Sequence, residues 1–264
     1  MERKIKNENY TTRLQKGGAL LEDMRVLVRS WNHSGSDKQR ERVIVENVLG
    51  KKTKMRAGDI YRRAFLHRFL KGNPPDAWRI VRLLEDREVP VEILRPVYFW
   101  ITARSEPLLY DFTTEEILSK SKIQNLSVRV DETAQWIRKR LIEQHQTWTD
   151  TVTTKVSRGL LAALRDFGIL EGTANKRIAP VYLPVESFAY LAFVLHELGS
   201  SGERLIRHSD WKLFLMESPV VERLFLDAHQ HRLLRYDAAG KIYRIDFSVR
   251  NAEEMADAVA GRRN

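Results

Sequence analysis

The stretch Trp148–Leu183, WTDTVTTKVSRGLLAALRDFGILEGTANKRIAPVYL, decides how this chain of 264 residues folds. Its first half has the spacing of a helix with two opposite faces, since successive residues on a helix turn by about 100°. One face is apolar and comprises Val156, Leu160, Ala163, Leu164 and Phe167. The other is polar or cationic and comprises Thr151, Thr154, Lys155, Arg158 and Arg165. The pattern predicts a helix that is buried on one side and basic on the other.

A glycine and a short basic hairpin follow this helix. We expect Gly168 to end the helix, because glycine readily adopts the left-handed conformation found there. A turn is expected near Gly172–Asn175, directly before Lys176 and Arg177. A cationic helix followed by a basic-tipped hairpin is typical of a winged helix-turn-helix, whose helix enters the major groove of DNA while the hairpin reaches phosphate or the minor groove. The alternative is a solvated helix face beside an ordinary hairpin.

The chain is basic, and most of its excess charge lies near its beginning. It contains 45 Lys and Arg against 35 Asp and Glu, a net charge of +10. Residues 1–70 contain 17 Lys and Arg against 8 Asp and Glu, a net +9, so the rest of the chain is nearly neutral. This balance favours a polyanionic partner, nucleic acid first. A solvated basic surface would have the same composition.

Length and composition restrict the class of protein. A hydrophobic content of 43% allows a packed core, and 264 residues suffice for one large or two to three small domains. No cysteine occurs, which excludes disulfides, thiolate catalysis and cysteine-ligated zinc. The longest apolar run, Phe188–Leu195, is shorter than the ~20 residues that span a bilayer, and the first residues have no apolar signal core. We expect a soluble cytoplasmic protein without membrane insertion.

The hydrophobic pattern predicts a mainly α fold in three consecutive domains. Residues 1–110 are expected to form a helical, basic N-terminal domain, and residues 111–184 have the element order of a winged helix-turn-helix. Residues 185–264 are expected to contain helices followed by a β-hairpin around Asp237–Gly240. This last segment is either a second winged module or a hairpin that closes a helical domain.

The N-terminal domain is expected to enlarge the positive surface. A first helix is expected over Thr12–Trp31, and a basic connector, Lys51–Arg56, leads to a helix from about Gly58. Four cations of the connector would extend the electrostatic footprint: Lys51, Lys52, Lys54 and Arg56.

Four segments resemble a known family. They are Tyr10–Asp23 (YTTRLQKGGALLED), Asp59–Phe69 (DIYRRAFLHRF), Arg95–Phe112 (RPVYFWITARSEPLLYDF) and Val156–Leu170 (VSRGLLAALRDFGIL). These stretches are similar to those of the BrxA proteins of bacterial BREX phage-defence systems, over most of the chain. The motifs are hydrophobic and structural rather than catalytic. The resemblance implies a DNA-binding accessory protein without known enzymatic activity. It does not identify any base-contacting residue in this chain.

The sequence contains no strong pattern of an enzyme or of a metal site. There is no glycine-rich phosphate loop. His229, His231 and Glu222 would need further ligands to hold a metal, and polar residues at a helix end explain them more simply. A nuclease at Pro75-Asp76 has no convincing Asp/Glu-x-Lys partner. We therefore expect no cofactor, no metal and no catalytic residues.

The leading interpretation is a non-enzymatic accessory protein that binds double-stranded DNA largely through phosphates. The DNA-binding residues would lie on the helix (Thr151, Thr154, Lys155, Arg158, Arg165), on the wing (Lys176, Arg177) and on the basic connector. Two alternatives stay open. The first is a scaffold that binds other BREX proteins, since winged folds also serve protein interactions. The second is an RNA-binding helical protein.

Overall fold

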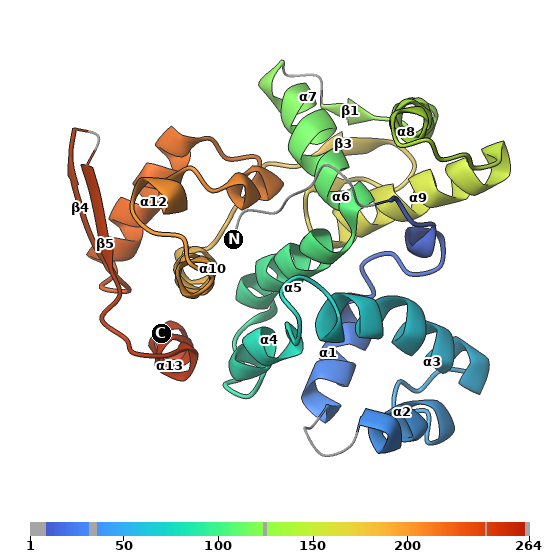
Figure 1. The fold of residues 1–264 in the computed structure, drawn as a ribbon, viewed down its shortest axis with the longest axis horizontal. Coiled ribbons are helices and arrows are strands. Elements are labelled where there is room, and N and C mark those ends of the chain that lie inside the picture. Colours follow the sequence, from blue (N-terminus) through green and yellow to red (C-terminus); the bar gives the residue numbers. More distant parts are fainter. Residues whose placement is uncertain (1–8, 32–35, 124–125, 241, 262–264) are drawn as a thin grey trace. The chain divides into compact units, whose positions relative to one another are not determined.

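The structure, a computed structural model, describes residues 9–31, 36–123, 126–240 and 242–261 and is mainly helical (Figure 1). Its residues cluster into two compact units. We call residues 5–79 and 101–180 the basic unit, because they contain 29 Lys and Arg against 18 Asp and Glu, a net +11. Residues 1–4, 80–100 and 181–264 form the neutral unit, with 16 Lys and Arg against 17 Asp and Glu, a net −1. All of the excess positive charge therefore belongs to one unit.

The first half of the basic unit is helical. It comprises η2 (Arg13–Gln15), α1 (Leu21–Ser30), α2 (Ser36–Val45), α3 (Lys54–Ile60) and the π-helix η3 (Tyr61–Leu70). Aromatic side chains join the end of α1 to η3, since Trp31 lies against Tyr61 and Phe65, and Phe65 stacks on Phe69. The boundary between the two units falls inside α4 (Trp78–Glu85) and α5 (Val91–Ser105).

The second half of the basic unit combines helices with a small sheet. It comprises α6 (Pro107–Asp111), η4 (Phe112–Ile117), α7 (Leu118–Lys122), β1 (Ser127–Val128), α8 (Val130–Glu143), α9 (Asp150–Asp166), β2 (Leu170–Glu171) and β3 (Lys176–Ile178). The three strands form an antiparallel sheet of order β1-β3-β2. The chain thus returns after α9 to pair β3 with a strand that precedes α8.

The core of the neutral unit is built on one apolar helix, α10 (Val185–Glu197). All residues of α10 from Ser187 to Leu195 are buried, as expected for a helix that is hydrophobic around its whole circumference. The unit also contains α11 (Glu203–Ile206), η5 (Ser209–Phe214), α12 (Ser218–Gln230), β4 (Arg235–Ala239), β5 (Ile242–Asp246) and α13 (Ala252–Ala260). Strands β4 and β5 form the expected hairpin, with its turn at Gly240 rather than earlier.

Two local expectations for the N-terminal half are wrong. The helix expected over Thr12–Trp31 is interrupted, and only α1 and the short η2 are helical within it. The expected connector Lys51–Arg56 is partly helical, because α3 begins at Lys54 and not near Gly58. Thr53 caps this helix, since its side chain accepts a hydrogen bond from the Arg56 amide. The mainly α character is confirmed, whereas the winged helix-turn-helix and the division into three domains stay predictions.

Candidate nucleic-acid interface

Helix α9 buries the face that its sequence pattern predicted. Val156, Leu160, Ala163 and Leu164 are fully buried and Phe167 is nearly so. The helix begins at a cap in which the Thr149 side chain accepts a hydrogen bond from the Val152 amide, and Gly168 follows its end with φ +82°. The pattern missed Thr153 and Ser157, which are also buried because their hydroxyls donate to carbonyls one turn earlier.

The opposite face of α9 presents cations of two kinds. Lys155 and Arg158 are exposed, and neither has an ion-pair partner among the described residues. Arg165 is half-buried and is paired with its neighbour, since its Nη2 lies 2.6 Å from Asp166 Oδ1. Thr151 is exposed and Thr154 half-buried on the same face. The net positive charge available to a ligand therefore comes from Lys155 and Arg158.

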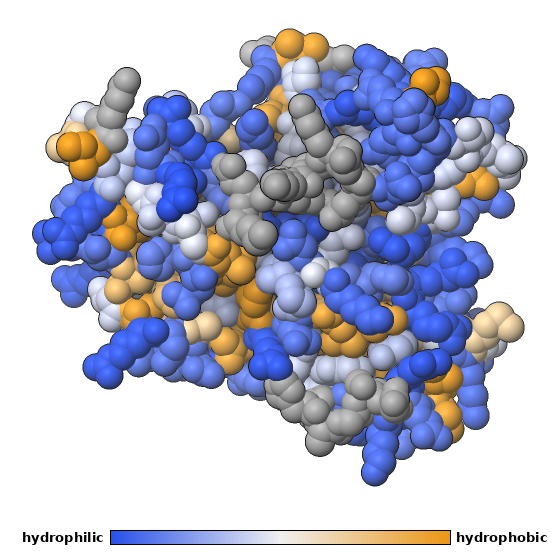
Figure 2. All heavy atoms as spheres, viewed as in Figure 1, coloured by the Kyte–Doolittle hydropathy of each residue, from blue (hydrophilic) through white to orange (hydrophobic). Residues whose placement is uncertain are grey.

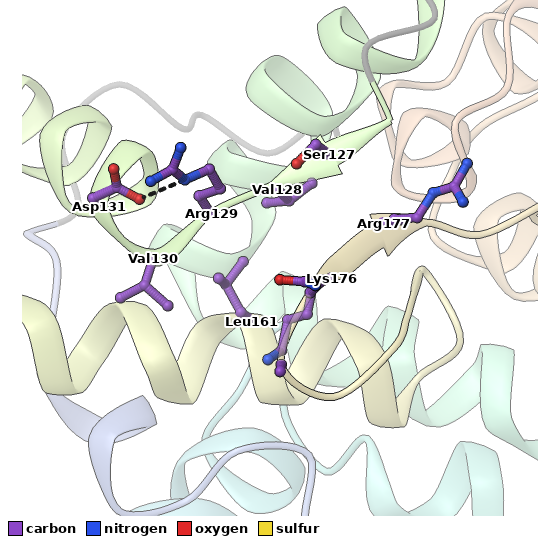
Figure 3. Close-up of a pocket in the computed structure, with 10 residues that line it drawn as sticks. Ser127, Val128, Arg129, Val130, Asp131, Leu161, Lys176 and Arg177 are labelled. Atoms are coloured by element: carbon purple, nitrogen blue, oxygen red, sulfur yellow. Dashed lines mark ion pairs between the residues drawn. The ribbon is translucent and has the colours of Figure 1, made fainter.

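The hairpin after α9 is built on a glycine turn. Gly172 has φ +83°, and a Cβ at this position would lie 2.2 Å from the Asn175 carbonyl oxygen, so a side chain is excluded there. The two basic residues that follow point to opposite faces of the sheet, as alternate strand residues do (Figure 3). Lys176 donates to the Thr173 carbonyl at 2.7 Å, whereas Arg177 is exposed and lies in register with Glu171.

A pocket of about 500 Å³ lies between this hairpin, β1, the start of α8 and Leu161 of α9 (Figure 3). Its ionisable lining residues are Arg129, Asp131, Lys176 and Arg177. Arg129 is paired with Asp131, with 3.2 Å between Nε and Oδ1. The Arg129–Asp131 pair carries no net charge, so the excess charge of the lining is the positive charge of Lys176 and Arg177.

The cations around α3 also differ in their partners. The Lys51 ammonium lies 2.7 Å from Asp23 Oδ1 and is neutralised. Arg56 donates through Nη1 to the Lys16 carbonyl at 3.0 Å and keeps its charge. Lys52 and Lys54 are exposed and have no ion-pair partner in the described part of the chain. This group therefore offers three available charges rather than four.

All the predicted DNA-binding residues lie in the basic unit, in two groups. One group is on α9 and the hairpin, and the other is on and before α3. Sequence reasoning missed Lys16, which has an exposed side chain and whose carbonyl binds Arg56. Its place before Gly17 and Gly18, two residues that disfavour a continuous helix, was the signal available for finding it.

Among the residues that the structure describes, no group of three or more His, Asp or Glu side chains is arranged to hold a metal ion. Within the same described ranges, no helix has both the length and the apolar composition that crossing a bilayer would need.

Comparisons with known proteins identify the family. A solved structure of an uncharacterized protein from Magnetospirillum magneticum is similar, with a TM-score of 0.59 and 17% identity over 76% of this chain and 98% of that one, a likeness that concerns the fold alone. No curated protein matches the chain. The model of the BrxA family matches residues 8–194, which is well over half of the sequence. The chain therefore belongs to the BrxA family.

Proposed function

We propose that the protein binds double-stranded DNA through the exposed face of α9 and acts as a non-enzymatic accessory protein. Membership of the BrxA family implies a protein of a BREX phage-defence system. The observation that supports DNA binding most strongly is a pair of cations on α9, Lys155 and Arg158, which have no ion-pair partner among the described residues and lie in a unit of net charge +11. Such a surface attracts phosphates and releases their counterions on binding.

The element order supports a winged helix-turn-helix as the way in which α9 meets DNA. The sequence α7, β1, α8, α9, β2, β3 with a β1-β3-β2 sheet matches the order of that motif. In this interpretation α9 is the recognition helix in the major groove, and the loop Gly172–Asn175 is the wing. Arg177, exposed on the hairpin, would lie along a phosphate beside the groove.

The exposed face of α9 supports binding with little sequence preference. Bases are read best by bidentate side chains, commonly Arg on guanine and Asn or Gln on adenine. This face has no Asn or Gln, and its residues are mainly Thr, Lys and Arg. We therefore expect contacts to phosphates to dominate the affinity.

The test is binding of the purified protein to several unrelated duplexes over a series of salt concentrations. We expect similar affinities for all duplexes and a steep loss of affinity between ~50 and ~200 mM salt. A folded protein that does not bind any duplex at ~50 mM salt would overturn the proposal. Competition between duplex DNA and duplex RNA separates the RNA-binding alternative, because an RNA-binding protein would be displaced better by RNA.

A second candidate function is the binding of a protein partner by the neutral unit. Val220 and Leu226 on α12 are exposed to 42% and 46%, and Ile242 near the β4–β5 turn to 75%. Figure 2 shows hydrophobic residues exposed over this part of the neutral unit. Exposed apolar side chains favour protein contacts over phosphate contacts. Co-purification of other defence-system proteins with the wild type, and its loss in Val220→Glu/Leu226→Glu, would support this function.

A further inference from the structure

An N-terminal segment, Tyr10–Gly18, lies directly on the backbone of α9, and we call it the strap. A Cβ at Gly159 of α9 would lie 2.1 Å from the Leu14 carbonyl oxygen, so the strap fits only because residue 159 is a glycine. A Cβ at Gly18 would lie 3.6 Å from the Gly159 carbonyl oxygen and 3.7 Å from the Ala163 amide nitrogen. Gly159 thus lets the two backbones approach closely, whereas a Cβ at Gly18 would make only ordinary van der Waals contacts.

A buried arginine fixes the far end of the strap. Arg68, which is fully buried, donates from Nη2 to the Gly17 carbonyl at 2.6 Å and from Nη1 to the Gly18 carbonyl at 2.8 Å. Its Nε donates to Glu106 Oε1 at 3.0 Å. A buried charge is tolerated when its polar atoms are bonded, and here all three guanidinium nitrogens have acceptors. The bonds to Gly17 and Gly18 therefore fix the path of the strap.

The near end of the strap is held by a tyrosine. The Tyr10 hydroxyl donates to Asp111 Oδ2 at 2.8 Å, and the Tyr10 amide donates to Gln146 Oε1 at 2.8 Å. Burial raises the pKa of Tyr10, and the negative charge of Asp111 raises it further, so the hydroxyl keeps its proton and stays a donor. Both ends of the strap are thus held by hydrogen bonds beside α9.

The strap forms one border of the exposed face of α9, and the wing forms the other. Lys155 lies one helical turn before Gly159, so it is on the strap side of this face. On the other side, Leu161 lines the pocket beside the β2–β3 hairpin that is shown in Figure 3, and Thr154 lines a cleft against α8. The free cations of α9 therefore lie between the strap and the wing.

The strap also connects α9 to the cations of α3. Arg56 of α3 donates to the Lys16 carbonyl at 3.0 Å, and Lys16 itself has an exposed side chain without an ion-pair partner among the described residues. Lys54 begins α3, two residues before Arg56, and is likewise exposed and unpaired in the described part. The backbone of Lys16 thus contacts Arg56 of α3 and belongs to the strap that lies on α9.

We propose that Lys16, Lys54 and Arg56 form a second phosphate-binding site beside α9, joined to it by the strap, so that the protein covers a longer stretch of duplex DNA than α9 and the wing alone. This inference rests on the proposed function. A recognition helix and its wing contact about one turn of duplex, ~10 bp. The additional cations would bind phosphates beyond that turn and raise affinity only when the duplex is long enough to reach them.

The test compares Lys16→Ala/Lys54→Ala with wild type on duplexes of ~10 and ~30 bp, which lie below and above the length that α9 and the wing occupy. Both side chains are exposed and make no ion pair with any residue that the structure describes, so the variant should fold. The matched control is Lys212→Ala/Arg223→Ala, which removes two exposed charges from the neutral unit. On the long duplex we expect a log–log salt slope lower by ~2 and roughly 10- to 100-fold weaker binding at ~100 mM salt, with little change on the short one.

The outcomes separate this inference from the proposed function. If wild-type protein binds no duplex at low salt, the proposed function fails. Wild type could bind while Lys16→Ala/Lys54→Ala and the control reduce the affinity for the long duplex equally. In that case the second site is refuted and DNA binding by α9 stands. If Lys16→Ala/Lys54→Ala lowers the affinity for both duplexes equally, Lys16 and Lys54 act as part of the α9 site, and the longer footprint is refuted.

Discussion

Two parts of this molecule each have helices followed by a β-hairpin, and their surfaces differ. In the basic unit, helices α8 and α9 precede the β2–β3 hairpin, and in the neutral unit helices α10 to α12 precede the β4–β5 hairpin. The exposed face of α9 bears Lys155 and Arg158, neither of which has a carboxylate partner in the described residues. The exposed face of α12 combines Val220 and Leu226 with one cation and one carboxylate, Arg223 and Asp227.

The two hairpins differ in the same way. On the outer face of β4–β5, Arg235 is paired with Asp237 and Arg244 with Asp246, at 2.9 and 2.7 Å. These four charges cancel, whereas Arg177 on β3 is exposed and has no ion pair within the described residues. The presence of helices followed by a hairpin thus does not determine the partner. The charges left unpaired on the helix and hairpin determine which partner the surface can attract.

The largest effect is expected from a change that tests which side of each helix is buried. Leu164 of α9 is fully buried, so Leu164→Ala should lower the free energy of unfolding by about 2–5 kcal/mol. Leu226 of α12 is 46% exposed, so Leu226→Ala should change it by less than ~0.5 kcal/mol. Urea unfolding of both variants measures the difference. Equal destabilisation would show that the comparison of the two helix faces is wrong.

The buried face of α9 could be predicted from the sequence because its information is local. Apolar residues at helical spacing, a capping threonine and a following glycine are sufficient to define it. The strap could not be predicted in this way. Its path depends on Arg68, whose bonds to Gly17 and Gly18 join residues about fifty positions apart, and no local pattern records them. The local pattern predicts a helix over Thr12–Trp31. That prediction is wrong because the distant bonds of Arg68 set the path of the chain at Gly17 and Gly18.

A second, smaller effect on stability tests the strap itself. In Gly159→Ala the new Cβ would lie 2.1 Å from the Leu14 carbonyl oxygen, which is backbone and cannot move without displacing the strap. We expect destabilisation by about 1–3 kcal/mol despite the better helix propensity of alanine. The matched control is Gly58→Ala in α3, where the Cβ would meet only the flexible Arg62 guanidinium at 3.1 Å.

Calorimetric melting of both glycine variants provides the measurement. Gly58→Ala should be neutral or slightly stabilising, so a loss of stability confined to Gly159→Ala would support the close approach of strap and helix. If both alanines stabilise by the ~1 kcal/mol typical of a helix interior, the strap does not lie where we place it.

A third effect should appear in binding rather than in stability. Lys155→Ala/Arg158→Ala should leave the melting temperature nearly unchanged, because exposed unpaired charges contribute little to folding. The same variant should weaken binding to every duplex and lower the log–log salt slope by ~2. Arg165→Ala should change the slope less than either single change on α9, because Asp166 already neutralises Arg165. A larger effect of Arg165 than of Lys155 and Arg158 together would contradict this assignment.

The candidate site was only partly predictable for a related reason. Sequence spacing located the cations of α9, since it needs only the helical period. It did not show which cations are free. Arg165 and Asp166 are neighbours in sequence, so this pairing could have been foreseen, but Lys51 and Asp23 are brought together by the fold. The orientation of Lys176 and Arg177 to opposite faces follows from strand alternation, once the strand boundaries are known.

The smallest effect concerns the pH dependence of the basic unit. Burial lowers the pKa of His67 in η3 below its usual value of ~6.5, and the positive charge of Arg13 on the strap lowers it further, against the opposite influence of Glu106. The unfolded chain therefore binds a proton at His67 more readily than the folded protein, so this residue reduces stability as the pH falls through ~6.5. Its contribution should be small, because His67 is only partly buried and water screens it.

We expect the loss of stability between pH 7.5 and pH 5.5, measured by urea unfolding, to be smaller in His67→Gln than in wild type, as the linkage relation requires. His231→Gln, which changes an exposed histidine of the neutral unit, should leave that loss unchanged. An equal change in both variants would show that the pKa of His67 is not lowered in the folded protein.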